Sequence, residues 1–284
     1  MESNQEGAQL ALGTAQLKGT YGVLSDGRIA TDGQAFEVLD EAKHLGFCAV
    51  DTAPTYPNAE GLIGRSRWTG SVWTKLDGRL PVEESIARSL ERLRRDTVDI
   101  VFVHDVTTLW SMPKTTMRAL EALRGSVTAR LGVSVYEPQE LTRAIDILPV
   151  DVVQVPINAF DQRFVRQHED GNLPTTCSYV ARSVFLQGIL AQPDEACARV
   201  PIELRMPLLL WAEACRQSRV APGRAALSYV QSQRLASAII VGGESPEQLR
   251  TIARWSRDMV PQERLRLNSS LDQWPISDPR RWTT

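Results

Sequence analysis

The chain has 284 residues, of which 43% are hydrophobic and 23% are charged, a composition typical of a soluble globular protein that buries a full core. Its formal net charge of −2 gives no electrostatic reason to expect a nucleic acid or an anionic membrane as partner. A chain of this length forms either two ordinary domains or one large α/β barrel.

Targeting and redox signals are weak along the whole sequence. Residues 1–6 lack the basic and apolar regions of a signal peptide, and no apolar run reaches the roughly 18 residues of a membrane span. The cysteines form no CxxC pair, and the histidines form no HExxH or HxH pattern. We therefore expect a cytoplasmic protein with reduced thiols and no protein-bound metal.

Short apolar runs rich in β-branched residues alternate with amphipathic segments along most of the chain. The runs predict buried strands at 10–13, 48–51, 71–75, 98–104, 130–134, 152–155, 177–181 and 238–241. The amphipathic segments predict helices at 32–45, 58–66, 81–94, 113–124, 137–147, 161–169, 203–218, 222–233 and 246–256. Ser245 before Pro246 is typical of a helix N-cap followed by proline at the first helical position.

This alternation predicts the fold. Eight β/α units without a long linker favour an α/β protein with a single (β/α)8 TIM barrel, over about residues 9–256, and an irregular C-terminal tail over 257–284. We expect the barrel and its tail to form one domain. A doubly wound open sheet is the alternative, and it is less favoured because no GxGxxG fingerprint follows the first strand.

Polar residues stand at or just beyond the ends of three successive predicted strands. Asp51, Lys75 and His104 come at these ends, and Tyr56 follows five residues after Asp51. A charge or an imidazole at the tip of a buried strand is costly unless it is paired, and the carboxyl ends of barrel strands meet on one face. We therefore expect the four side chains to form a single site.

These residue types suit the delivery of a proton to a carbonyl oxygen. A tyrosine phenol has a pKa of about 10, and a nearby ammonium such as that of Lys75 favours its ionised form. Asp51 can keep Lys75 protonated and in place, and His104 can orient the oxygen. No side chain donates a hydride, so a cofactor must supply it. The set predicts a nicotinamide-dependent carbonyl reductase.

Motifs spread along the chain match one family. They are Gly13-Thr14-Ala15-Gln16, Asp51-Thr52-Ala53-Pro54-Thr55-Tyr56, Thr74-Lys75-Leu76, the run 98–104, Gly132-Val133-Ser134, Gln154-Val155-Pro156-Ile157-Asn158, Gln187-Gly188 and Val241-Gly242-Gly243. Over about residues 9–256 the chain resembles the aldo-keto reductases. The resemblance implies reduction of a carbonyl by NADPH or NADH, with Tyr56 as general acid, Lys75 and Asp51 tuning it, and His104 orienting the substrate.

The resemblance also implies where the ligands bind. Ser134 and Gln154 match residues that hold the cofactor's carboxamide, and Arg182 stands where many relatives carry an aromatic residue stacked on the nicotinamide. The implied cofactor-binding residues are Gly13, Thr14, Ala15, Asp51, Ser134, Gln154, Arg182, Ser183, Phe185, Leu186, Gly188, Gly242, Gly243, Glu244 and Gln248. On the substrate side we expect Tyr21, Trp110 and Tyr136, and tails such as 257–284 often wall the substrate pocket in this family.

The loop after the last strand departs from relatives that prefer NADPH. Those relatives usually place Arg or Lys there to bind the 2′-phosphate, whereas this chain has Glu244 and Gln248 after two glycines. A carboxylate repels a phosphate but can accept a hydrogen bond from a free ribose hydroxyl. We predict that NADH is at least competitive with NADPH, with Arg250 as the residue that could still reach the phosphate.

Two other functions stay open at this point. The altered cofactor positions allow a regulatory barrel that binds nucleotide with little turnover, and a tightly held cofactor would allow redox-neutral elimination or epimerisation. The expected partner is a small-molecule carbonyl substrate, either a sugar or a small biosynthetic carbonyl. We expect no nucleic acid and no membrane partner, and a monomer or weak homo-oligomer.

Overall fold

The computed structural model describes residues 8–261, 272 and 278–282. Eight parallel strands form a closed barrel in chain order, with the last strand paired to the first. They are β1 (Gln9–Gly13), β2 (Ala49–Asp51), β3 (Ser71–Leu76), β4 (Val98–Val103), β5 (Thr128–Ser134), β6 (Val152–Pro156), β7 (Ser178–Arg182) and β8 (Ala238–Val241). The predicted (β/α)8 barrel is confirmed, and the open-sheet alternative is wrong because the sheet has no free edge.

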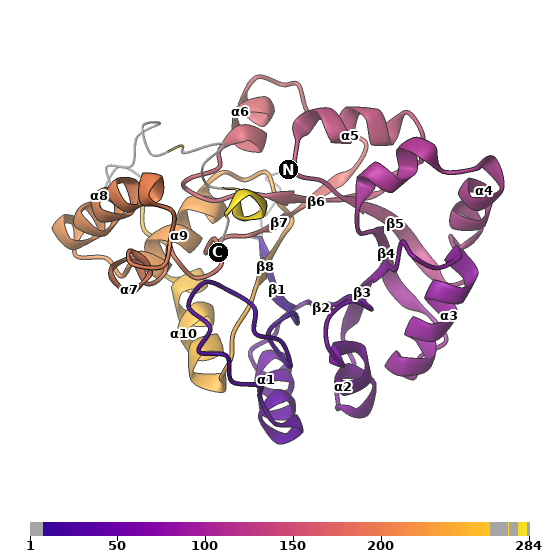
Figure 1. The fold of residues 1–284 in the computed structure, drawn as a ribbon, viewed down its shortest axis with the longest axis horizontal. Coiled ribbons are helices and arrows are strands. Elements are labelled where there is room, and N and C mark those ends of the chain that lie inside the picture. Colours follow the sequence, from indigo (N-terminus) through magenta and orange to yellow (C-terminus); the bar gives the residue numbers. More distant parts are fainter. Residues whose placement is uncertain (1–7, 262–271, 273–277, 283–284) are drawn as a thin grey trace, which may run out of the picture.

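Helices surround the strands on the outside of the barrel (Figure 1). They are α1 (Asp32–His44), α2 (Ala59–Arg65), α3 (Val82–Leu93), α4 (Lys114–Ala122), α5 (Pro138–Ile145), α6 (Arg163–Glu169), α7 (Pro193–Ala196), α8 (Ile202–Ser218), α9 (Pro222–Ser232) and α10 (Pro246–Arg257). The short turns η1 (Val106–Ser111) and η3 (Pro279–Arg281) complete the described elements. Every predicted strand and helix is present, with bounds within two residues of those expected.

Three short elements were not predicted, namely α7, η1 and η3. Each is too short to show a hydrophobic period in the sequence. The N-cap expected for α10 is present, since the Ser245 hydroxyl accepts a hydrogen bond from the Gln248 N–H at 3.3 Å. Of the tail predicted over 257–284, the described part contains the end of α10 and η3, and the rest lies outside the described residues.

The core has two layers. The barrel interior is filled by Ala11, Ala49, Trp73, Ile100, Phe102, Val152, Val180 and Ala238, and a larger layer packs between the strands and the helices. Gly132 on β5 makes room inside the barrel, because a Cβ there would lie 2.4 Å from the Phe102 ring. This packing makes the barrel solid, so that ligands can bind only at its ends.

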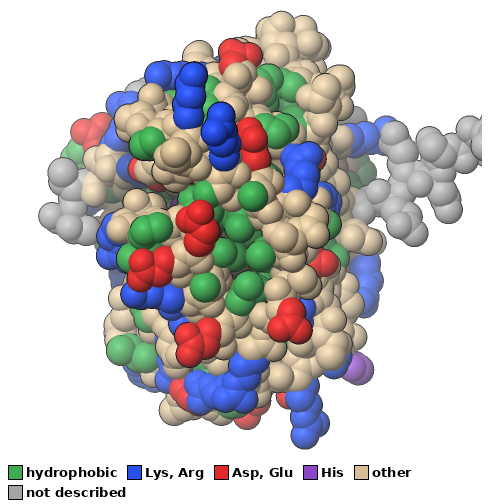
Figure 2. Space-filling view, turned by 90° about the vertical axis from the view of Figure 1, so that its right-hand side faces the viewer, with side chains coloured by type: hydrophobic (Ala, Val, Ile, Leu, Met, Phe, Trp, Pro, Cys, Tyr) green, Lys and Arg blue, Asp and Glu red, His purple; other side chains and the backbone are tan. Residues whose placement is uncertain are grey.

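The face of the molecule drawn in Figure 2 has no charge patch of a single sign. On the face shown in Figure 2, basic and acidic side chains are interspersed around a central group of hydrophobic side chains. Within the described part of the chain, none of the helices combines the length and apolar character needed to cross a bilayer.

Strand ends set the positions of the candidate site. Asp51, Ser134 and Arg182 are the last residues of β2, β5 and β7, Lys75 is one residue before the end of β3, and His104 directly follows β4. Because all strands are parallel, these residues lie at the same end of the barrel.

Candidate active site

A cavity of about 830 Å³ lies at the carboxyl ends of the strands, within the range of about 300–1,000 Å³ that is usual for ligand sites. Its lining comes from the loops that follow β1, β2, β4, β5, β7 and β8, and from α10 and η3. The expected residues that line it are Gly13, Thr14, Ala15, Tyr21, Asp51, Tyr56, Lys75, His104, Ser134, Tyr136, Gln154, Arg182, Ser183, Phe185, Leu186, Gly188, Gly242, Glu244 and Gln248. The topology therefore brings almost the whole predicted set together.

A buried ion pair occupies the floor of this cavity. The Lys75 ammonium donates to Asp51 Oδ2 at 2.7 Å and to the Thr52 carbonyl at 2.8 Å, and both charged side chains are almost fully buried. The Asp51 carbonyl accepts from both the N–H and the hydroxyl of Thr14, at 3.0 and 2.9 Å. The carboxylate is thus fixed through its side chain and its main chain.

The strand that carries Lys75 is anchored by a second buried carboxylate. Glu60 on α2, 2% exposed, accepts from the Thr74 hydroxyl at 2.6 Å and from Arg92 Nε at 2.7 Å. Thr74 directly precedes Lys75, so this network fixes the end of β3 against α2 and α3.

Tyr56 and His104 lie beside the ion pair. The Lys75 ammonium is 5.2 Å from the centre of the Tyr56 ring, and the rings of Tyr56 and His104 are 6.2 Å apart and nearly perpendicular. Burial opposes the charge of Lys75, but the Asp51 carboxylate and the Tyr56 hydroxyl outweigh it and raise the pKa of Lys75 above its ordinary value. Burial and the Lys75 charge lower the pKa of His104 to about 4, so at neutral pH its imidazole is uncharged.

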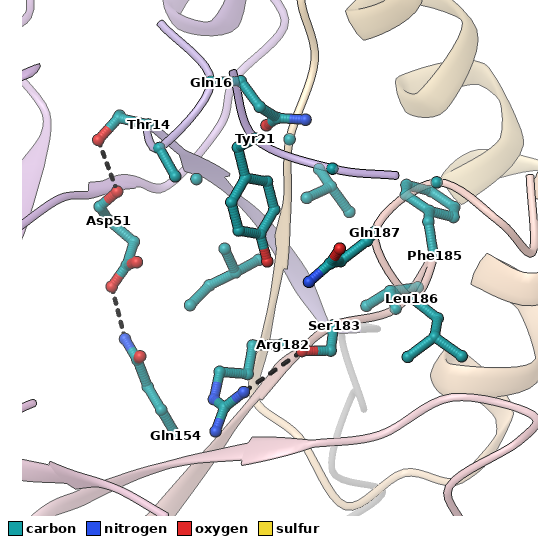
Figure 3. Close-up of a pocket in the computed structure, with 18 of the residues that line it drawn as sticks. Thr14, Gln16, Tyr21, Asp51, Gln154, Arg182, Ser183, Phe185, Leu186 and Gln187 are labelled. Carbon is teal, nitrogen blue, oxygen red and sulfur yellow. Dashed lines mark hydrogen bonds between the residues drawn. The ribbon is translucent and has the colours of Figure 1, made fainter. Parts of the chain in front are cut away.

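Gln154 reaches the same carboxylate from the opposite side of the barrel mouth. Its amide nitrogen donates to Asp51 Oδ1 at 2.5 Å, and Figure 3 shows this link together with the Thr14 contact. The two Asp51 oxygens are therefore divided between Lys75 and Gln154.

Two guanidinium groups pack on one aromatic ring in the lining of the cavity. Arg182 Cζ is 4.1 Å and Arg280 Cζ 3.6 Å from the centre of the Tyr136 ring. Arg182 also donates to the Val135 carbonyl at 2.9 Å and to the Ser183 hydroxyl at 3.3 Å. Arg280 belongs to the C-terminal tail, so a tail residue does line the cavity.

The far end of the cavity is formed by the loop after β8 and by α10. Gly242 allows close approach there, because a Cβ on it would lie 1.8 Å from Gln16 Oε1. The Glu244 N–H donates to Gln248 Oε1 at 2.8 Å. The α10 residues that line this end are Glu247, Gln248, Thr251, Ile252 and Trp255.

Some expected residues lie elsewhere, and some lining residues were missed. Gly243 lines a smaller neighbouring cavity with Gln16 and Glu244, and Trp110 in η1 packs with its ring 4.3 Å from Arg143 Cζ instead of lining the cavity. Trp255 is seven residues after Gln248 and therefore lies on the same face of α10, so the sequence could have predicted it as a lining residue. No sequence signal pointed to Arg280.

Comparison with known proteins identifies the family. The family model for the aldo/keto reductase family matches residues 9–267. The chain belongs to the aldo-keto reductase family. Membership makes it an oxidoreductase of a family that reduces carbonyl compounds and generally uses NADPH or NADH.

Individual aldo-keto reductases similar to this chain differ in what they act on. The chain is 26% identical to a D-threo-aldose 1-dehydrogenase from a Pseudomonas species over 91% of its own length and 95% of that protein. It is 30% identical to glyoxal reductase from Bacillus subtilis over 43% of its length and 49% of that protein.

Solved aldo-keto reductases share the fold. One from Bacillus halodurans superimposes with a TM-score of 0.75 at 19% identity, covering 99% of this chain and 97% of that one. A glycerol dehydrogenase from Gluconobacter oxydans gives a TM-score of 0.70 at 18% identity, covering 94% and 92%. At these identities the likeness supports the barrel alone.

Proposed function

We propose that this protein reduces an aldehyde or ketone to an alcohol, or catalyses the reverse oxidation, with NADH or NADPH as hydride source and Tyr56 as the general acid. The observation that carries the proposal is the placement of the Tyr56 phenol beside a buried Lys75 ammonium that Asp51 holds in its charged form. A fixed cation beside the phenol can stabilise the negative charge that develops on its oxygen during proton transfer.

Each polar side chain has a distinct part in this scheme. Tyr56 gives its proton to the carbonyl oxygen as that oxygen becomes an alkoxide, and Lys75 stabilises the phenolate left behind. Asp51 keeps Lys75 charged and in place. His104, uncharged at neutral pH, donates an N–H hydrogen bond that orients the carbonyl oxygen. A bound nicotinamide would supply the hydride, which no side chain can.

The residues of the cavity fit a dinucleotide. Ser134 and Gln154 are polar and close to the ion pair, where a carboxamide needs hydrogen-bond partners. At the other end, Ile252 and Trp255 offer apolar surface for an adenine, and the absence of a side chain on Gly242 makes room for Gln16 in the cavity lining.

NADH is at least competitive with NADPH in this proposal. The cationic residues that line the cavity, Lys75, Arg182 and Arg280, pack around Asp51 and Tyr136, and the adenosine end carries Glu244 instead. Arg250, which could have reached a 2′-phosphate, pairs with Glu41 at 3.0 Å and with Glu247 at 2.5 Å. A phosphate placed near Glu244 would meet repulsion, and Arg28, which lines the small neighbouring cavity with Glu244, is paired with Asp26 at 3.0 Å.

The test measures cofactor consumption with a panel of aldehydes, ketones and aldoses, in wild type and in Tyr56→Phe. Wild type should oxidise NAD(P)H in proportion to the alcohol formed. Tyr56→Phe should lose turnover by about 10²–10⁴-fold, the usual contribution of a general acid, and should keep its cofactor dissociation constant.

Tyr179→Phe is the matched control, since this hydroxyl bonds the Pro174 carbonyl outside the cavity, and it should keep wild-type turnover. Equal turnover in Tyr56→Phe and wild type would exclude Tyr56 as the acid. Cofactor binding without turnover across the panel would favour a regulatory barrel, and turnover without cofactor consumption would favour elimination or epimerisation.

A further inference from the structure

Three cationic side chains line the described cavity, and two of them are neutralised by carboxylates. Lys75 is paired with Asp51 at 2.7 Å. Arg280 forms two hydrogen bonds with the Asp278 carboxylate, from Nη2 to Oδ2 at 2.7 Å and from Nε to Oδ1 at 3.0 Å. Arg182 differs: within the described part of the chain no carboxylate lies within ion-pair distance of its guanidinium.

The contacts of Arg182 are all with neutral groups. They are the Val135 carbonyl, the Ser183 hydroxyl and the Tyr136 ring. Its Nε is buried and has no hydrogen-bond acceptor among the described residues. Glu140, an acid in the lining, uses its carboxylate to accept from the N–H groups of Tyr136 and Glu137 at 2.7 and 3.0 Å.

A half-buried guanidinium without a counter-charge is unfavourable, since desolvation weakens its interaction with water and only neutral groups replace that water. Arg280 packs against the same Tyr136 ring but is neutralised by Asp278, so it adds no net charge there. The Tyr136 side of the cavity therefore carries one positive charge, that of Arg182, without a carboxylate partner among the described residues, and an anionic ligand would neutralise it.

The direction of the side chain decides between the two anions that could bind there. Figure 3 shows Arg182 extending from the end of β7 under Tyr21 and toward Gln154, away from Phe185 and Leu186. Phe185 and Leu186 are expected cofactor-binding residues, whereas Gln154 is expected to meet the uncharged carboxamide of the nicotinamide. The guanidinium, packed on Tyr136, therefore lies at the nicotinamide end of the cavity, where the carbonyl substrate must meet the ring.

We propose that the carbonyl substrate carries a carboxylate, and that Arg182 binds this carboxylate and so determines specificity. The inference rests on the proposed function. Carboxylates match a planar guanidinium, which can donate two parallel hydrogen bonds to them. In the reaction, hydride from NAD(P)H adds to the carbonyl carbon and Tyr56 protonates the oxygen. The products are a hydroxycarboxylate and NAD(P)⁺, and the carboxylate itself is unchanged.

The test compares two aldehydes of nearly equal shape, 4-carboxybenzaldehyde and the uncharged 4-nitrobenzaldehyde. The readout is the ratio of their kcat/KM values, because effects of a variant on folding or on the chemical step act on both substrates alike. In Arg182→Met this ratio should fall at least about tenfold, as expected for the loss of a charged hydrogen bond. Arg182→Lys, which keeps the charge, should recover part of the loss.

Arg143→Met is the matched control. Arg143 also packs on an aromatic ring, that of Trp110, but it does not line the cavity, so the ratio should stay at the wild-type value. An unchanged ratio in Arg182→Met overturns the proposal. A loss of NADH affinity in Arg182→Met with no change in the ratio also overturns it, because Arg182 would then pair with a cofactor phosphate.

A binding measurement separates failure of this inference from failure of the proposed function. If wild type reduces neither aldehyde nor any member of the carbonyl panel, the proposed function fails. Calorimetric titration of 4-(hydroxymethyl)benzoate into the NADH complex still reports on Arg182. Binding that weakens at least about tenfold in Arg182→Met supports the carboxylate site, and binding that is absent or equal in both proteins overturns it.

Discussion

Gln154 on β6 donates a hydrogen bond to the carboxylate of Asp51 on β2, across the mouth of the barrel. The amide nitrogen of Gln154 is therefore engaged with the protein, and its amide oxygen is the part left to face a carboxamide. This link ties the predicted cofactor residue to the ion pair of the predicted catalytic group.

Replacing Gln154 should therefore weaken the fold as well as the site. Gln154→Leu leaves Asp51 Oδ1 buried without its donor, and the free energy of unfolding should fall by about 1–3 kcal/mol. Urea denaturation measures the loss. Gln233→Leu is the control, because Gln233 donates to neutral groups, the Tyr229 main-chain carbonyl on α9 and the Ser232 hydroxyl. An equal loss in both variants would mean that the Asp51 contact has no special weight.

The Lys75–Asp51 pair should show strong coupling. Lys75→Met leaves a buried carboxylate unpaired, at a cost of about 3–5 kcal/mol, and it removes the charge beside Tyr56. The double variant Lys75→Met/Asp51→Asn should regain much of the stability but none of the turnover. Unfolding and kinetic measurements on the cycle check this. Additive stability losses would contradict the pairing.

Glu244 should govern the choice between the two nucleotides. In wild type, NADPH should not bind more than about tenfold tighter than NADH, a gap of about 1.4 kcal/mol. Glu244→Arg should shift the ratio of the two dissociation constants toward NADPH by at least about tenfold, since it replaces repulsion by attraction. Glu121→Arg on α4, outside the cavity, controls for net charge. The same shift in both variants would argue against a local effect.

His104 should make the fold sensitive to acid. Its pKa is about 4 in the folded protein and about 6.5 in the unfolded chain. The unfolded chain takes up the proton first, so the free energy of unfolding should fall as the pH drops from about 6.5 toward 4. The part due to His104 is on the order of 1–3 kcal/mol.

This acid effect is measured as the difference between wild type and His104→Gln in urea titrations at pH 7 and pH 4.5. Wild type should lose more stability than the variant over this interval. His168→Gln, at an exposed position on α6, should behave like wild type. A parallel loss in wild type and His104→Gln would show that His104 is not held in its neutral form.

The sequence was sufficient to predict the barrel and the meeting of Asp51, Lys75 and His104. Strand ends are readable because apolar runs end abruptly, and parallel closure then brings those ends to one face. The Gln154–Asp51 contact joins residues 103 positions apart, and its geometry depends on rotamers that no local pattern encodes. Arg280 enters the cavity from an irregular tail, so its place depends on tertiary contacts such as that with Tyr136.

Trp110 illustrates the opposite case. Its position after His104 suggested a place in the substrate pocket, but the short turn η1 directs the indole toward Arg143. A turn of this length has no period in the sequence from which its direction could be predicted.

The anchoring of Asp51 by Thr14, Lys75 and Gln154 determines how much order the site must still gain when a ligand binds. A carboxylate restrained through both main chain and side chain has little conformational freedom left to lose when substrate arrives. The entropy of ordering these groups is lost when the chain folds, so under the proposed function the Lys75 charge is already in place for the charge that develops on the reacting oxygen.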